Sequence, residues 1–337
     1  MSAAPAECPR AAGPARLLAR RLGHGLLLLF GVSLFSFVLL ELAPGSFFDE
    51  MRLDPRISPE TIAAQRARYG VDRPLPERYG RWLTSLASGE MGYSFAYGTP
   101  VGPLLHRRAL NTVGLAAAAT ALAWLLAVPL GVWFAARRGS CPDRVGAAAT
   151  SGLLATPDLL LALALLLAAA RTGWLPTGGM VSRDFADLGR LAQVADVAWH
   201  AVLPVTALVL GMLPGLVRHV RASMLEALRS PFVRAARAHG IPARRLLFRH
   251  ALPAAANPLC SLVGLSVASL LSTSMLVEVV MGWPGLGPLL LEAILARDVY
   301  LVIGPVMAST LLLLAGNLLG DALLLAFDPR IRREAAA

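Results

Sequence analysis

The chain has 337 residues, 56% of them hydrophobic and 15% charged, and it carries a formal net charge of +10. This composition excludes an ordinary soluble domain of this length and indicates a polytopic membrane protein. In such a protein, arginine-rich cytoplasmic loops explain the positive charge better than a nucleic-acid interface does. All 31 basic residues are arginines, so the chain cannot contain a phosphate-binding loop of the form G-x-x-x-x-G-K-[ST], and any nucleotide-driven work must come from a partner chain.

The N-terminal part of the chain predicts a cytoplasmic tail over residues 1–21 and a first transmembrane helix over residues 22–43. An apolar run of about 20 residues matches a hydrocarbon core of about 30 Å at about 1.5 Å per residue. Residues 44–109 are more polar and predict a helical loop on the extracytoplasmic side. Within this loop, Ser58-Pro59-Glu60 has the pattern of a helix start and Gly70 that of a helix stop.

Residues 110–327 form the expected membrane core, which adds five transmembrane helices. Pro157 and Asp158 interrupt the second of these. Arginines are about twice as dense in the segments assigned to the cytoplasm as in those assigned outside, which favours six spans with both termini inside and a cytoplasmic tail at 328–337. The five core spans are expected at residues 110–136, 145–170, 200–217, 259–280 and 300–327, with external loops at 171–199 and 281–299.

Residues 218–253 form a basic segment between two apolar runs, where a membrane protein is expected to expose a cytoplasmic loop. Pro231 can start a short helix that Gly240 ends in a left-handed conformation, and Pro242 can start a second helix that Pro253 ends. A connector that contacts anionic head groups would explain the arginines. It would not explain the spacing of the alanines, the glycine and the proline, which favours a hairpin that docks into a partner.

The motif in this segment reads Arg234-Ala235-Ala236, three residues, Gly240, nine residues and then His250-Ala251-Leu252-Pro253. It resembles the loop E-A-A, three residues, G, nine residues, I-x-L-P of permease subunits of bacterial ATP-binding-cassette (ABC) importers. Arg234 and His250 replace the Glu and the Ile, as is common in the dipeptide/oligopeptide branch of that family. The implied ATPase-coupling residues are Arg234, Ala235, Ala236, His239, Gly240, Arg244, Arg245, His250, Leu252 and Pro253.

Two further strings carry the same resemblance, which extends from about residue 16 to about residue 333. The first is a turn that begins after Glu278 and is similar to the family's E-x-x-x-x-W-P-G-L/V-G string; its marker residues are Trp283, Pro284, Gly285 and Gly287. The second is Asp328-Pro329-Arg330-Ile331-Arg332, which is similar to the family's D-P-R-x-R ending.

The resemblance implies an all-α membrane protein of the bacterial inner membrane with six transmembrane helices, the B-type (first) permease subunit of an importer. Its implied partners are a second homologous permease, two ABC ATPase subunits that use ATP and magnesium, and an extracytoplasmic solute-binding protein. The chain itself is expected to be no enzyme and to hold no cofactor or metal. Di- and oligopeptides are the implied substrates. Nickel or a metal chelate carried by the same architecture is one alternative, and a stand-alone channel or ion-coupled carrier is another.

Polar side chains inside the apolar runs are candidates either for a translocation pathway or for packing between helices. Carboxylates along a pathway would suit a cationic or zwitterionic solute. Asn317 and Asp321 lie four residues apart on one helical face, which favours a hydrogen-bonded seam between two helices. The candidates are Glu41, Asn111, Asp158, Glu278, Asn317 and Asp321.

Overall fold

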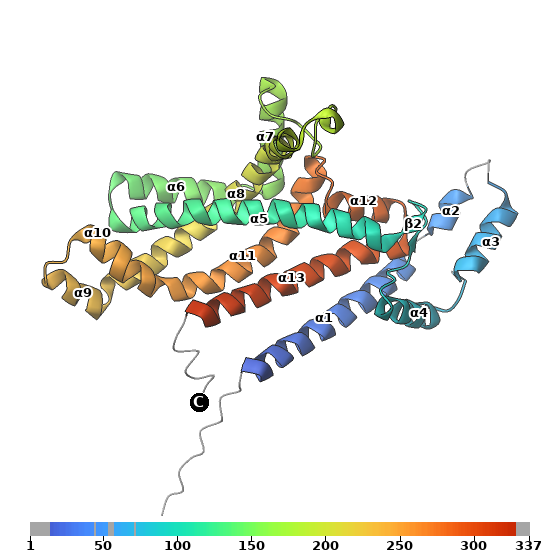
Figure 1. Ribbon diagram of the computed structural model, residues 1–337, viewed down its shortest axis with the longest axis horizontal. Helices are drawn as coiled ribbons and strands as arrows, with labels where there is room; N and C mark the ends of the chain where they lie inside the picture. Colours follow the sequence, from blue (N-terminus) through green and yellow to red (C-terminus); the bar gives the residue numbers. More distant parts are fainter. Residues whose placement is uncertain (1–13, 44, 53–56, 71, 328–337) are drawn as a thin grey trace, which may run out of the picture.

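The computed structural model describes residues 14–43, 45–52, 57–70 and 72–327, which are mostly helical (Figure 1). The predicted tails fall largely outside these residues, and the D-P-R-x-R string at 328–332 does so entirely. The five long helices are α1 (Pro14–Leu42), α5 (Val101–Ala136), α8 (Arg190–Arg229), α11 (Leu252–Val280) and α13 (Val299–Phe327).

Shorter elements connect the long helices. Before the core come α2 (Phe47–Met51), α3 (Pro59–Tyr69), α4 (Leu75–Ala87) and an antiparallel pair of two-residue strands, β1 (Tyr93–Ser94) and β2 (Thr99–Pro100). Within the core come α6 (Cys141–Ala155), α7 (Asp158–Thr172), the 3₁₀ turn η1 (Phe185–Asp187), α9 (Pro231–Ala238), α10 (Ala243–Arg245), the π-helix η2 (Leu246–Ala251) and α12 (Leu286–Leu295).

In the described part of the chain, five helices are long and apolar enough to cross a membrane, and α6 with α7 makes a sixth if the pair is one broken span. The prediction of one span over residues 145–170 needs correction, because α6 and α7 meet at 99°. The break has a local cause. Pro157 disfavours the helical conformation for the residue before it, and Thr156 is extended, with φ −90° and ψ 122°.

The fourth core segment is much longer than the predicted span over residues 200–217. Helix α8 runs for 40 residues, so it takes in residues that were assigned to the loops on both sides. Pro204 and Pro214 both lie inside the helix and do not end it. It ends only at Ser230, which is extended and precedes Pro231. The predicted external loop at 281–299 likewise contains a helix, α12.

Small residues bring the core helices together, as membrane helices generally require. A stripe of buried alanines on α5 is part of the largest core cluster: Ala116, Ala119, Ala123 and Ala127. Helices α11 and α13 cross at Gly264 and Gly320, so closely that a Cβ on Gly264 would lie 2.6 Å from the Cα of Gly320. Helix α1 lies at the edge of this core, against α13 and α4 (Figure 1).

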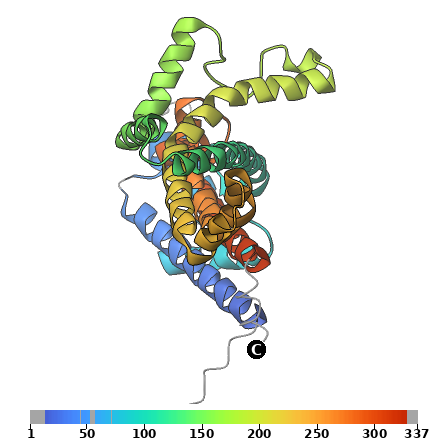
Figure 2. The ribbon, with the colours of Figure 1, turned by 90° about the vertical axis from the view of Figure 1, so that its left-hand side faces the viewer.

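The bundle has two distinct ends. The α9–α10 hairpin lies at one end, and α2, α3 and the β-hairpin lie at the other (Figure 1). Helix α7 and the start of α8 extend away from the bundle (Figure 2). The 29-residue helix α11 separates the α9–α10 hairpin from the Trp-Pro-Gly turn, so the predicted coupling residues and this turn are two distinct sites.

Candidate functional site

The first half of the hairpin has the structure that Pro231 and Gly240 predict. Helix α9 begins with Pro231 and is followed by Gly240 in a left-handed conformation with φ +77°. The amide of Gly240 donates to the carbonyl of Arg237 at 3.0 Å, and the amide of Ile241 donates to that of Ala236 at 3.3 Å. This pair of bonds is a Schellman motif, which satisfies carbonyls at the end of α9 and fixes the bend.

The predicted end of the second hairpin helix is wrong, because the chain stays helical through Pro253. A short α-turn, α10, leads into the six-residue π-helix η2, and α11 starts at Leu252. In η2 the amide of Leu252 bonds the carbonyl of Leu247, five residues back. The wider turn accommodates a proline that lacks an amide and would clash in a regular helix. The hairpin is therefore joined to α11 without a flexible break.

The hairpin packs through a few apolar side chains and leaves the rest accessible. Val233 of α9 and Leu246 of η2 are buried, and α9 and η2 contact each other. Phe232 and Phe248 are 50% and 56% exposed. Of the predicted coupling residues, Ala236, His250 and Leu252 are partly buried, and the others are exposed: Arg234, Ala235, His239, Gly240, Arg244, Arg245 and Pro253.

The sequence reasoning missed the two phenylalanines. Aromatic residues and arginines are both enriched at protein interfaces, so exposed phenylalanines beside the arginines strengthen the interpretation of this surface as an interaction site. The sequence alone could have indicated them, because Phe232 and Phe248 are large aromatic residues in a basic segment and do not belong to an apolar run. The hairpin thus presents an apolar and positively charged surface.

An ion pair ties α8 to α6, and no sequence pattern predicted it. The Nε of Arg221 donates to Oδ1 of Asp143 at 2.6 Å, and its Nη2 donates to Oδ2 at 2.9 Å. Asp143 is buried and also accepts from the amide of Gly139 at 2.9 Å. A bidentate pair between a guanidinium and a carboxylate fixes orientation as well as charge. It therefore couples the last three turns of α8 to the α5–α6 corner.

The second site is the turn between α11 and α12. The buried carboxylate of Glu278 accepts from the amide of Gly287 at 2.8 Å. A Cβ on Gly285 would lie 2.4 Å from the carboxyl carbon of Glu278, and a Cβ on Gly287 would lie 2.3 Å from the carbonyl oxygen of Met275. Both glycines are required because the turn folds back against α11 with no room for a side chain.

Helix α5 holds this turn from the other side. The side-chain Nδ2 of Asn111 donates to the carbonyl of Pro284 at 2.8 Å. The backbone carbonyl of Asn111 accepts from Nε1 of Trp283 at 3.3 Å. The hydroxyl of Thr112 accepts from the amide of Leu286 at 2.8 Å. The structure thus brings together two of the polar candidates, Asn111 and Glu278, as anchors of one turn between α5, α11 and α12.

The other polar candidates of the core belong to helices outside this turn: Asp158 belongs to α7, and Asn317 and Asp321 belong to α13. Asp158 begins α7 and lines a cavity of about 110 Å³ with Ser269 and Thr273 of α11. Asn317 lines an apolar cleft of about 540 Å³ between α1 and α13. Asp321 belongs to α13, but its side chain is outside what the structure describes. In the described part of the chain, no three His, Cys, Asp or Glu side chains are grouped as metal ligands.

These features define the class of the molecule: a polytopic helical membrane protein with an accessible basic hairpin between two membrane-spanning helices. Residues 127–333 match the family described as the binding-protein-dependent transport system inner membrane component, and residues 15–116 match its N-terminal family. The chain belongs to this family of multi-pass inner-membrane permeases, which are transport proteins rather than enzymes.

Curated relatives align along almost the whole chain. The oligopeptide transport system permease protein AppB of Bacillus subtilis is 34% identical over 320 residues, which cover 94% of this chain and 99% of AppB. The oligopeptide transport system permease protein OppB of Mycobacterium tuberculosis is 32% identical over 94% of this chain and 99% of its own length. The dipeptide transport system permease protein DppB of Escherichia coli is 32% identical over 95% of this chain and 99% of its own length.

Proposed function

We propose that this chain is a permease subunit of an ATP-driven, binding-protein-dependent importer that carries di- or oligopeptides across the inner membrane. The observation that carries this proposal is the hairpin, whose exposed surface is joined without a break to a membrane-spanning helix on the α11 side. The names of the relatives AppB, OppB and DppB, which are oligopeptide and dipeptide permeases, favour peptides as the solute.

The proposed mechanism is a lever. One extended residue, Ser230, separates α8 from α9, and η2 continues directly into α11. A partner that moves the hairpin would therefore move α8 and α11 with it. The Arg221–Asp143 pair would carry the same displacement to α6. In this scheme ATP-driven closure of the partner ATPases tilts these helices between inward-open and outward-open states, which is a shift between two packed arrangements.

The proposed assembly contains this chain, a second homologous permease, two ABC ATPase subunits and an extracytoplasmic solute-binding protein. The family description supports a binding protein. The lack of lysine supports separate ATPase subunits, because the chain has no phosphate-binding loop of its own. The hairpin and both termini would lie in the cytoplasm, as the arginine distribution predicts.

Transport by the purified assembly in vesicles tests this proposal. Labelled dipeptide should accumulate only when the binding protein is present with ATP on the ATPase side. Nickel offered with the same components should not accumulate. Equal dipeptide uptake by this chain alone, without ATP, would contradict the proposal and favour a channel or an ion-coupled carrier.

A further inference from the structure

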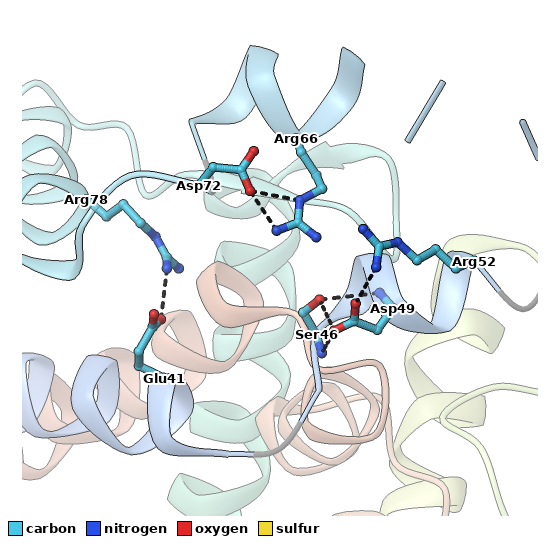
Figure 3. A network of polar contacts seen from close by, with 7 residues as sticks. All are labelled: Glu41, Ser46, Asp49, Arg52, Arg66, Asp72 and Arg78. Carbon is cyan, nitrogen blue, oxygen red and sulfur yellow. Dashed lines mark hydrogen bonds and ion pairs between the residues drawn. The ribbon is translucent and has the colours of Figure 1, made fainter. Parts of the chain in front are cut away.

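A charged cavity of about 570 Å³ lies at the end of the bundle opposite the hairpin. The last turn of α1, helices α2, α3 and α4, and the corner between α12 and α13 surround it. Figure 3 shows the polar contacts on the side of α1 to α4. The charged residues of the lining are Glu41, Asp49, Arg66, Arg78 and Arg297.

The two carboxylates of the cavity already have partners. Asp49 accepts from the amide and the hydroxyl of Ser46 at 2.9 and 2.7 Å, and Glu41 accepts from Nη1 of Arg78 at 2.8 Å (Figure 3). Arg78 is only 9% exposed, and its buried Nε has no hydrogen-bond partner in the described structure. An unpaired buried donor of a charged group is unfavourable, so this side of the cavity lacks an acceptor.

Arg297 supplies a second guanidinium in an unusual way. It has φ +52°, and in the described part of the chain no other residue except glycine has a positive φ. Its amide and that of Asp298 close a Schellman motif on α12, with bonds to Ile294 at 3.1 Å and Ala293 at 3.0 Å. Glycine is the usual residue at this position, since a side chain is strained there. Strained residues cluster at functional sites, which makes the side chain of Arg297 a candidate for one.

The surroundings hold Arg297 at the cavity. A Cβ on Gly45 would lie 1.9 Å from Nη1 of Arg297, so the guanidinium packs directly against the backbone of Gly45. The neighbouring Asp298 is buried and accepts from the hydroxyl of Ser94 at 2.8 Å and the amide of Ala96 at 3.1 Å, which fixes the corner. No described carboxylate forms an ion pair with Arg297. The cavity therefore has two guanidinium groups with capacity for an anion: the buried one of Arg78 and the exposed one of Arg297, whose backbone the corner fixes.

The position of the cavity indicates what that anion is. It opens at the end of α1, the candidate span with the smallest buried share. Leu39 and Leu42, close to the cavity, are 49% and 75% exposed. Acyl chains that lie along this apolar surface would bring a head group to the arginines, which match phosphate oxygens in geometry and charge. We propose that Arg78 and Arg297 bind the phosphodiester of a phospholipid at this end of α1.

Native mass spectrometry of the detergent-purified full chain tests the site, with dioleoyl phosphatidylethanolamine and dioleoyl phosphatidylglycerol as lipid probes and glycerol 3-phosphate as the soluble probe. Arg297→Gly should weaken binding of both lipids about tenfold, because it removes charge-assisted hydrogen bonds. The same change suits the left-handed backbone, so the melting temperature should stay equal or rise. The matched control is Arg81→Ala, which removes an exposed arginine of α4 outside the cavity.

Three outcomes would overturn the proposal. The first is unchanged lipid binding by Arg297→Gly and by Arg78→Ala. The second is displacement of the lipid by glycerol 3-phosphate at equal concentration, which would assign the site to a free phosphate ester. The third is unchanged lipid binding together with loss of the binding protein's effect on ATPase activity in Arg297→Gly, which would assign the arginines to an acidic protein partner.

Discussion

The carboxyl group of Glu278 fills the space beside the Cα of Gly285, where a Cβ would lie 2.4 Å from the carboxyl carbon. The same carboxylate accepts from the amide of Gly287, so one side chain sets both the shape of the turn and the need for glycine in it. Asn111 and Thr112 of α5 form hydrogen bonds with the backbone of this turn. This relationship gives a physical reason for a string that sequence comparison recognises only as a pattern.

The first prediction concerns this contact. Gly285→Ala should lower the free energy of unfolding by about 1–3 kcal/mol, because the added methyl group forces a buried contact apart. Thermal unfolding in detergent measures the change. The control is Gly114→Ala in α5, where an added Cβ meets nothing within 4 Å and helix propensity improves. If Glu278→Ala added to Gly285→Ala restores none of the loss, the two residues are not coupled as described.

The second prediction separates local strain from coupling. Gly240 and Gly139 have φ of +77° and +78°, and a Cβ at either position would meet nothing within 4 Å. Alanine at either position should therefore cost a similar amount, about 1 kcal/mol. Only Gly240→Ala should also reduce stimulation of ATP hydrolysis by loaded binding protein, since only it changes the bend of the hairpin. Equal effects of the two variants on ATP hydrolysis would count against the lever.

The third prediction concerns the exposed aromatic residues of the hairpin. Phe232→Ala and Phe248→Ala should each weaken binding of the ATPase subunits by about 1–3 kcal/mol, or about 5-fold to 150-fold, as expected for aromatic anchors. The measurement is titration of the purified ATPase subunits onto the detergent-solubilised chain. Phe35→Ala is the control, because Phe35 is similarly exposed but lies on α1. If both hairpin variants bound the ATPase subunits with wild-type affinity, Phe232 and Phe248 would not be part of the interface.

The fourth prediction concerns the pair between α6 and α8. Asp143→Ala should destabilise the chain by about 2–4 kcal/mol, because it leaves a partly buried guanidinium and the amide of Gly139 without their acceptor. Arg221→Lys keeps the charge but loses the bidentate geometry, so its loss should be smaller. Chemical unfolding in mixed micelles compares the two. An Asp143→Ala chain as stable as the wild type would show that the pair does not tie α6 to α8.

Sequence reasoning predicted the membrane class, the α9 bend at Gly240 and the helix between Ser58 and Gly70, because prolines, glycines and apolar runs act locally. In α3, for example, Ser58 caps the start and Gly70 ends the helix with φ +64°. Prolines gave divided results: Pro157 marks a 99° break, whereas Pro204, Pro214 and Pro253 stay inside or at the start of helices. Membrane helices tolerate proline where neighbouring helices or local adjustments such as a π-turn satisfy the freed backbone groups, and a local sequence pattern does not show these.

The contacts that connect distant segments could not be predicted for the same reason. Arg221 and Asp143 are 78 residues apart, and Asn111 and Pro284 are 173 apart. Asn111 and Glu278 were recognisable as polar residues in apolar runs, but no signal placed them at one turn. The left-handed conformation of Arg297 was also hidden, because arginine gives no sign of a position where glycine is the default.

We propose that the hairpin is the docking surface for the ATPase subunits, and the substitution Ala235→Arg tests this claim. Ala235 is exposed on α9, so a large charged side chain should block docking without disturbing the core. The measurement is co-purification of the ATPase subunits with the tagged chain, with Ala64→Arg on exposed α3, at the opposite end of the bundle, as control. We predict loss of co-purification for Ala235→Arg alone, at unchanged melting temperature. Wild-type amounts of ATPase on the Ala235→Arg chain would contradict the claim.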